Sequence, residues 1–518
     1  MGAFALAGVD ASRADASASS PVQSSGASAV PSGSPQPSFG EGSRPDAVSL
    51  AALAADVSSG PDIARRRALR LLTQITLFID HHDAVLAVPE VLRALLAVLA
   101  RSESDERRGS LSSTYLATRC LADLAKAPRA RAALVADARA LRALKHGLSP
   151  DTHEQSARAP GEASDAPDDT DDTSGVVAAA RAAAESARLA AALAGDAACH
   201  APMRAAGVID ALARADAAFE ASARWPHRAW RRWRRAFSFP TRRKLEAKAR
   251  GKRGVDDASE SNENDSETAT ETRVLTERAR HAAAAWFGFA GTSEGTAAIA
   301  EADATGLGVT RRVRAVAVAE TDAVAFRYAA GCLARLVAGD FFDAKPFAEK
   351  RETLRALASA LRSGDGQAAC FAAAAARAAL AEGSARTNAA LLRRGFVDGA
   401  LFLLTSPEEG WCVESPSKSA EHLKSAGGAR CSGTTAPLDA TRSYTKRNAS
   451  KRRNDGARLC ALRLLHAFAS SGDEATRRAV AVNGATILGE FAAGEARGAG
   501  AGAEIRNKAS AVLAELSL

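Results

Sequence analysis

The chain has 518 residues, of which 47% are hydrophobic, 25% are charged and 5% are aromatic. No run of 18 apolar residues occurs, so the sequence predicts no transmembrane helix. Alanine is abundant, and its small side chain permits close helix packing but buries little apolar area per residue. The formal net charge of +8 is unevenly distributed along the chain.

The seven cysteines are scattered, with no Cys-x-x-Cys pair and no histidines at metal-ligand spacing. An odd number of cysteines within alanine-rich segments indicates reduced thiols, so we expect an intracellular protein of the cytoplasm or nucleus. Residues 10–45, rich in Ser, Ala, Pro and Gly, leave organellar targeting open as an alternative.

Residues 1–60 are predicted to be a disordered low-complexity tail, because they lack the apolar periodicity that offsets the entropy of ordering. Apolar residues at three- and four-residue spacing then predict helical repeats over 61–149. Residues 150–174 contain closely spaced aspartates, and like charges repel, so we expect an acidic disordered linker. Another helical repeat is predicted over 175–222.

The composition changes abruptly over 223–272, which is basic and rich in tryptophan at first and then acidic. We interpret this segment as an insertion between helical repeats, which return over 273–405. A second insertion, Gly/Ser/Lys-rich and predicted to be disordered, occupies 406–454. A last repeat and a capping helix are predicted over 455–518.

The helical segments share a pattern of glycines 12 residues apart, at Gly195 and Gly207, Gly383 and Gly395, and Gly472 and Gly484. Related breaks at Gly291, Gly306 and Gly339 fall between helix-like segments. Gly291, Gly339 and Gly383 are 48 and 44 residues apart. A period of about 40–47 residues with two or three helices is typical of HEAT and armadillo repeats.

The segments 192–212 and 380–404 resemble armadillo repeats, with the end of a long helix, a short helix, a glycine and the next helix. The resemblance covers about two thirds of the chain and does not identify a member of the family. It implies an all-α fold, a right-handed α-solenoid of about seven armadillo-like repeats with long disordered insertions. It also implies a concave groove, lined by the third helix of each repeat, that binds extended peptides or other proteins.

Counting four residues back from each turn glycine identifies Phe287, Arg335 and Phe468 as candidate partner-binding residues in this groove. The alternative is that both phenylalanines are core residues. The importin-alpha branch of the family has asparagine at this place and tryptophan one turn earlier. Neither occurs here at the equivalent positions, which disfavours a nuclear-import receptor.

A second set of candidate partner-binding residues lies in the basic part of the insertion, within 225–253. On a helix the aromatic residues of this segment would share one face and the arginines would cover the other. The segment could pack on the solenoid, bind an anionic membrane or acidic protein, or bind nucleic acid through its arginines and stacked tryptophans. The candidates are Trp230, Arg231, Arg232, Trp233, Arg234 and Arg235.

The sequence around Ser293 matches the Gly-x-Ser-x-Gly motif of hydrolases, which functions where a strand turns sharply into a helix. Because both flanks are helical in pattern, we interpret it as a turn between helices. We predict no catalytic, cofactor-binding or metal-binding site, and no small-molecule substrate. The predicted function is a non-catalytic protein–protein interaction scaffold or adaptor.

Overall fold

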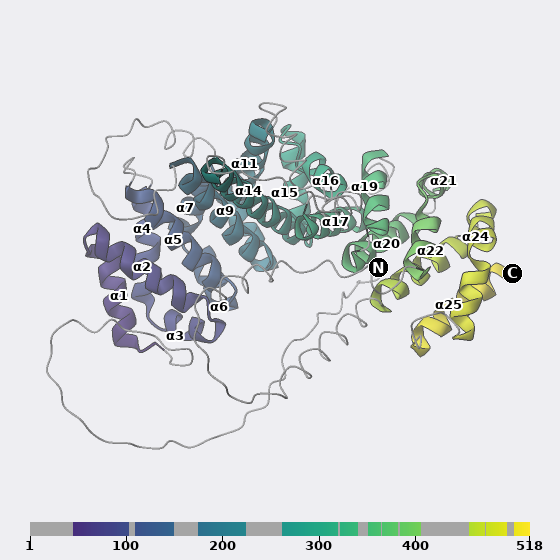
Figure 1. Ribbon diagram of the computed structural model, residues 1–518, viewed down its shortest axis with the longest axis horizontal. Coiled ribbons are helices and arrows are strands. Elements are labelled where there is room, and N and C mark those ends of the chain that lie inside the picture. The colour runs from purple at the N-terminus through teal and green to yellow at the C-terminus, as the bar shows by residue number, and fades with distance from the viewer. Residues whose placement is uncertain are drawn as a thin grey trace, which may run out of the picture. The chain divides into compact units, whose positions relative to one another are not determined.

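The computed structural model describes the chain in segments separated by gaps (Figure 1). The described residues are 45–102, 109–149, 175–223, 262–319, 322–339, 351–363, 365–381, 384–405, 455–471, 473–494 and 502–517. Every regular element within these ranges is a helix, and none of them contains a strand.

The helices recur in groups of three. The first helices are short: α3 (His82–Leu86), α6 (Pro128–Ala136), α10 (His200–Ala205), α15 (Ser293–Ala304) and α21 (Ala385–Arg393). The second helices are α4 (Pro89–Ser102), α7 (Ala138–Leu148), α11 (Val208–Ala223), α16 (Val309–Ala319), α19 (Arg351–Arg362) and α22 (Phe396–Thr405). The third helices are α5 (Gly109–Leu124), α9 (Gly175–Ala194), α14 (Asn262–Phe289), α17 (Ala323–Ala338), α20 (Gly366–Ala381) and the helix at 455–469.

Pairs of helices flank these groups, α1 (Ala47–Ser59) with α2 (Asp62–Thr76) before them and α24 (Glu474–Ala493) with α25 (Ala503–Ser517) after them. Single 3-10 turns, η1 (Ile79–His81) and η2 (Ala197–Cys199), precede α3 and α10.

Equivalent helices of successive groups pack on one another in two rows. One row contains α2 followed by the third helices α5, α9, α14, α17 and α20 (Figure 1). The other row contains the second helices α4, α7, α11, α16, α19 and α22, followed by α24. Each helix buries one face against its own group and another against the next group, which is how a solenoid forms a continuous core. The prediction of an all-α solenoid of about seven armadillo-like repeats is confirmed.

Two local features recur where one helix of the solenoid follows another. Gly207 and Gly395 have φ values of 71° and 70°, a left-handed conformation that lets the first helix end and the second begin. His82 and His200, at the start of first helices, hold the end of the preceding helix. The Nε2 atom of each ring lies 2.8 Å from a backbone oxygen six residues earlier.

The core is built from alanine and leucine with a few large side chains. Trp286 and Phe289 on α14 are almost fully buried, and the Trp286 Nε1 donates a hydrogen bond of 2.8 Å to Asp216 Oδ2 on α11. Glycine permits the closest helix contact, because an added Cβ on Gly288 would lie 2.4 Å from the Ala194 carbonyl oxygen. The rows therefore pack closely where α14 crosses the end of α9.

Three boundaries differ from those expected from the sequence. Helix α1 lies inside the predicted disordered tail and buries Leu50 and Val57 completely, so enough apolar side chains precede residue 60 to order a helix there. Helix α14 begins at Asn262, within the predicted insertion. Gly484 lies inside the continuous helix α24, so the expected break there is wrong; its φ is not left-handed. No helix among the described residues is long and apolar enough to cross a membrane.

The long gaps between described segments share a position in the repeat. Residues 103–108, 150–174, 224–261 and 406–454 each connect a second helix to a third helix. The gap at 340–350 instead precedes α19, where a first helix stands in other groups. The insertions expected at 150–174 and 406–454, and most of 223–272, lie outside the described residues, as does the N-terminal stretch 1–44.

Candidate functional site

The face formed by the third helices carries a series of ion pairs between neighbouring groups. Arg280 on α14 pairs with Asp322 at 2.6 Å, and Arg327 on α17 pairs with Asp365 at 2.6 Å. Each aspartate also caps the helix that follows it. Asp322 accepts from backbone N–H groups of α17, and Asp365 from those of α20. The pairs therefore fix each third helix against the next.

A polar cluster occupies this face where α5, α9 and α14 meet. Arg188 on α9 pairs with the fully buried carboxylate of Asp123 and, at 3.0 Å, with Glu185. Burial raises the pKa of Glu185, against the opposite effect of Arg188. Burial also lowers the pKa of His281 to about 4, with Arg188 and Arg280 adding to the effect, so the ring is neutral at pH 7.

Half-buried aromatic side chains form a second cluster on the same face, across α14, α17 and α20. The ring of Phe287 lies 5.7 Å from that of Tyr328 and 5.4 Å from that of Phe371, centroid to centroid, and both pairs are tilted. Such spacing and tilt are favourable for aromatic pairs. Gly331 provides the space, because an added Cβ there would lie 2.6 Å from Phe287 Cε2. We call these four residues and Arg335 the aromatic cluster.

Arg335 completes the aromatic cluster with a positive charge. Its Cζ atom lies 3.6 Å from the centroid of the Phe287 ring, and its Nη1 donates a hydrogen bond of 2.6 Å to the Phe287 carbonyl oxygen. Burial lowers the pKa of Arg335. A stacked guanidinium at this distance is a cation–π contact, which orients the planar group over the ring.

The predicted groove residues thus have different environments. Phe287 and Arg335 contact each other and are half-buried, whereas Phe468 is 0% exposed and belongs to the core of the helix at 455–469. Phe468 is unavailable to a partner, because its carbonyl and ring are enclosed at the helix end, where Thr476 Oγ1 donates to its carbonyl oxygen at 3.1 Å. The candidates Trp230 to Arg235 lie outside the described residues.

Sequence reasoning missed Tyr328, Phe371 and the role of Gly331. Counting only four residues back from a turn glycine samples one turn of a third helix. Phe371 stands 12 residues before Gly383, and Tyr328 stands 11 before Gly339, which places both further along the same helix face. Extending the count by two turns would have identified them.

A pair of thiols lies further along the row of third helices. Cys370 on α20 and Cys460 on the helix at 455–469 interact through a hydrogen bond, and Cys370 Sγ also lies 3.6 Å from the Gly456 carbonyl oxygen. The hydrogen bond from Cys370 lowers the pKa of Cys460, and Arg463 and Arg377 act in the same direction. The bond raises the pKa of Cys370.

Ser293 stands at a turn between helices, as expected. Helix α14 ends at Phe289, Thr292 caps α15 by accepting from the Gly295 N–H at 3.1 Å, and Ser293 is the first residue of α15. No strand precedes the motif, so the geometry of a hydrolase elbow is absent here. Among the described residues, no three His, Cys, Asp or Glu side chains are grouped so that they could hold a metal ion.

No protein-family model matches this chain, and no curated protein matches it. Several solved structures are similar to it. An engineered protein is 16% identical, with 90% of this chain and 99% of that chain covered, at a TM-score of 0.36. A designed armadillo repeat protein in complex with the peptide (KR)4 is 16% identical over 64% of this chain and 98% of that chain, at a TM-score of 0.39. A structure of computationally designed armadillo repeat proteins for modular peptide recognition is 16% identical over 64% of this chain and 99% of that chain, at a TM-score of 0.38.

Proposed function

We propose that the protein is a binding scaffold that recognises another protein through the face of its third helices, with the aromatic cluster as the centre of contact. The observation that carries the proposal is the cluster itself. Phe287, Tyr328 and Phe371 come from three successive groups and form one half-buried apolar surface beside the Arg335 guanidinium.

Aromatic and arginine side chains are the residue types that dominate the energetics of protein interfaces. The rings here are held by one another and by Arg335, so little conformational entropy is lost when a partner packs on them. The ion pairs of Arg280 and Arg327 with aspartates keep the helices on either side at fixed spacing. The surface is therefore preorganised, which favours affinity without rearrangement.

The chemistry of the cluster defines the kind of partner segment. An aliphatic or aromatic side chain would pack on the rings, and a carboxylate or backbone carbonyl would accept from the remaining N–H groups of Arg335. We infer a short apolar segment that carries at least one acceptor group next to its anchor residue. Binding of this kind involves no bond breaking, in keeping with a non-catalytic role.

The test is a selection of random displayed peptides on the full chain, followed by measurement of Kd for the selected peptides. Phe371→Ala and Arg335→Gln should each weaken binding at least about tenfold, because truncating a central anchor costs about 1.4 kcal/mol or more. Phe402→Ala is the matched control, since Phe402 is an exposed phenylalanine on the second helix α22 (47% exposed).

Circular dichroism melts of all three variants establish that they fold. The proposal is refuted if selection on the full chain yields only peptides whose affinity is unchanged by both cluster variants. It is equally refuted if Phe402→Ala weakens those peptides as much as Phe371→Ala does.

A further inference from the structure

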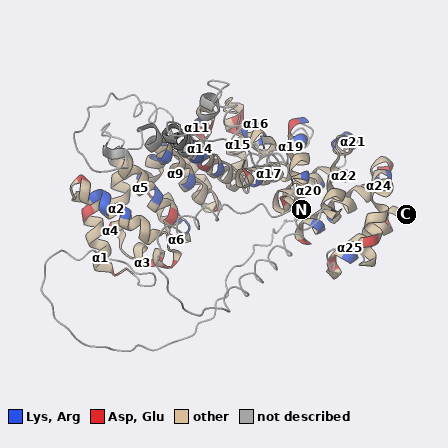
Figure 2. Cartoon of the chain, in the orientation of Figure 1, with Lys and Arg blue, Asp and Glu red and all other residues tan. Residues whose placement is uncertain are grey.

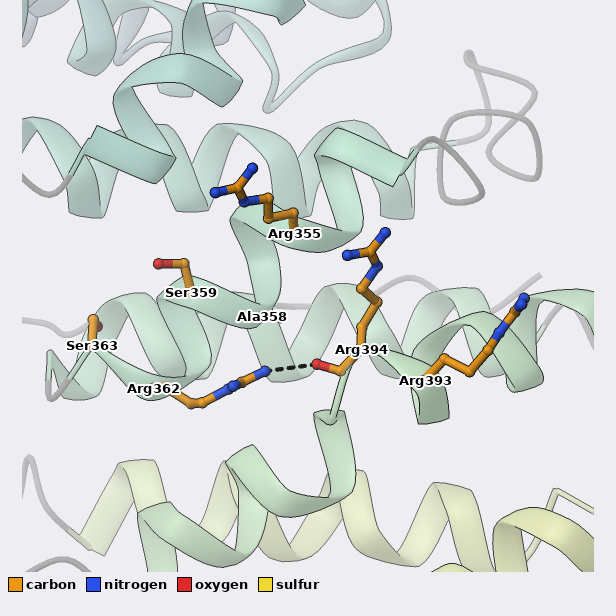
Figure 3. Close-up of a pocket in the computed structure, with 7 residues that line it drawn as sticks. All are labelled: Arg355, Ala358, Ser359, Arg362, Ser363, Arg393 and Arg394. Atoms are coloured by element: carbon orange, nitrogen blue, oxygen red, sulfur yellow. Dashed lines mark hydrogen bonds between the residues drawn. The ribbon is translucent and has the colours of Figure 1, made fainter.

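A hollow of about 540 Å³ lies on the row of second helices, between α19 and the turn that joins α21 to α22 (Figure 3). It does not belong to the face of the third helices. Four arginines and two serines line it: Arg355, Arg362, Arg393, Arg394, Ser359 and Ser363. Figure 2 shows basic residues on both α19 and α21, in two adjacent groups of the solenoid.

The sequence builds this hollow from a helix end. Helix α21 stops after Arg393, and Gly395, with φ of 70°, turns the chain into α22. Arg362 Nη2 on α19 donates a hydrogen bond of 2.7 Å to the carbonyl oxygen of Arg394, drawn as a dashed line in Figure 3. Arg362 is therefore a positioning residue that holds the turn, and with it Arg394, against α19.

Two of the four arginines of the hollow have no carboxylate partner among the described residues. Among the described residues, the guanidinium groups of Arg355 and Arg394 have neither a hydrogen-bond acceptor nor an ion-pair partner. Arg393 donates only to the Ala389 carbonyl within its own helix. No described residue that lines the hollow is acidic; the Asp398 carboxylate lies near Arg362 at the Gly395 turn and also accepts from the Asn483 amide at 3.4 Å.

Several guanidiniums around one concavity give it a positive potential that attracts anions. Several arginines of the third helices, such as Arg280 and Arg327, have a carboxylate partner. Guanidinium groups bind phosphate through paired N–H donors. The Ser363 hydroxyl already donates to the Ala360 carbonyl oxygen at 2.9 Å, so the arginines supply the donors of the hollow. The volume is in the range of pockets that take small ligands.

We propose that the hollow between α19 and the α21–α22 turn is a binding site for a small ligand that carries several phosphate groups. Arg355 and Arg394 bind phosphate oxygens directly, Arg393 adds charge at the rim, and Ser359 and Ser363 lie beside them. Guanidiniums extend from α19 and from the end of α21, so a ligand with two or more phosphates would engage both helices at once. The site is independent of the aromatic cluster.

Isothermal titration of the full chain with inorganic phosphate, pyrophosphate and tripolyphosphate tests the site. Affinity should rise along this series and fall as salt is increased, because the contacts are ionic. The variant R355Q/R394Q should bind tripolyphosphate at least about tenfold more weakly than the natural chain. The affinity of R355K/R394K should lie between the two, because lysine keeps the charge but loses the paired donors. The matched control is R139Q/R142Q, which removes two exposed arginines from the second helix α7.

The outcomes separate clearly. The site is supported if R355Q/R394Q loses affinity for tripolyphosphate and R139Q/R142Q retains it. Both variants must also have the melting temperature of the natural chain. Equal loss in the two variants, or no binding of any of the three anions at about 50 mM salt, overturns it. If R355Q/R394Q does not fold, the single variants R355Q and R394Q decide by the same comparison. Phosphatidylcholine vesicles with and without phosphatidylinositol bisphosphate, set against soluble inositol trisphosphate, then show whether the phosphates belong to a lipid headgroup or a free ligand.

Discussion

Gly288→Ala is expected to separate two third helices that are now in contact. The new Cβ would lie 2.4 Å from the carbonyl oxygen of Ala194 and 2.7 Å from its carbonyl carbon. An ordinary contact between carbon and oxygen is roughly 3.3 Å, so α14 and α9 must move apart by about 1 Å. The obstacle is backbone at a helix end, which cannot rotate away as a flexible side chain could.

Two opposing effects set the magnitude. Overpacking of a closed contact costs about 1–3 kcal/mol, whereas alanine is favoured over glycine within a helix by about 1 kcal/mol. Helix α9 is in turn paired to α5 through Arg188 and Asp123, so a displacement of α9 extends beyond one residue. We expect a net destabilisation of up to about 2 kcal/mol.

Gly489→Ala is the matched control. Gly489 also lies within a helix, α24, and nothing stands within 4 Å of its added Cβ. The same substitution should therefore stabilise the protein by about 0.5–1 kcal/mol through helix propensity alone. Urea titrations followed by circular dichroism should show midpoints that move in opposite directions. Equal shifts of the same sign would refute the packing argument.

Three further measurements test other contacts. Iodoacetamide should alkylate Cys460 near pH 8 much faster than Cys332. The hydrogen bond from Cys370 lowers the pKa of Cys460, whereas burial raises the pKa of Cys332 to about 12. Equal alkylation rates of the two cysteines in site-resolved mass spectrometry would contradict this. The pKa of His281 is 6.5 in the unfolded chain and about 4 in the folded chain, so the free energy of unfolding should fall as the pH falls from 6.5 toward 4. The slope should reach up to about 1.4 kcal/mol per pH unit and should be absent in His281→Gln. If the variant shows the same pH dependence as the natural chain, His281 is not its cause. Asp365→Ala removes the cap of α20 and the ion pair with Arg327. Urea titration should show that the free energy of unfolding falls by about 2 kcal/mol. A change within about 0.5 kcal/mol would show that these contacts contribute little.

The repeat pattern could be predicted from sequence because its signals are local. A turn glycine such as Gly207 or Gly395 takes a left-handed conformation that other residues avoid, so it marks the joint wherever it occurs. A glycine does not mark a turn when it is present because a neighbouring helix packs closely against it. Gly484 sits inside α24, where an added Cβ would lie 3.1 Å from Leu401 Cδ2 of the neighbouring helix, and a small residue there says nothing of a turn.

The candidate site could be predicted only in part. Position within a repeat identified Phe287 and Arg335 as candidate partner-binding residues but gave Phe468 the same status. The exposure of each side chain depends on which residues of the next group pack against it, and position within a repeat does not give this. Phe287 faces Gly331 and remains half-buried, while Phe468 is enclosed. The arginines of the hollow come from a second helix and from the end of the following first helix. No spacing rule joins Arg355 to Arg394, since the turn at Gly395 brings them together.

The placement of the long gaps has a consequence for how this chain can vary. Helix α14 packs on α9 and α17, and α20 packs on α17. Sequence added or removed between a second and a third helix therefore leaves the stacking surfaces untouched, and each such joint tolerates change independently of the others. Chains descended from a common ancestor of this one should differ most in length at these joints and should align best when matched along their third helices.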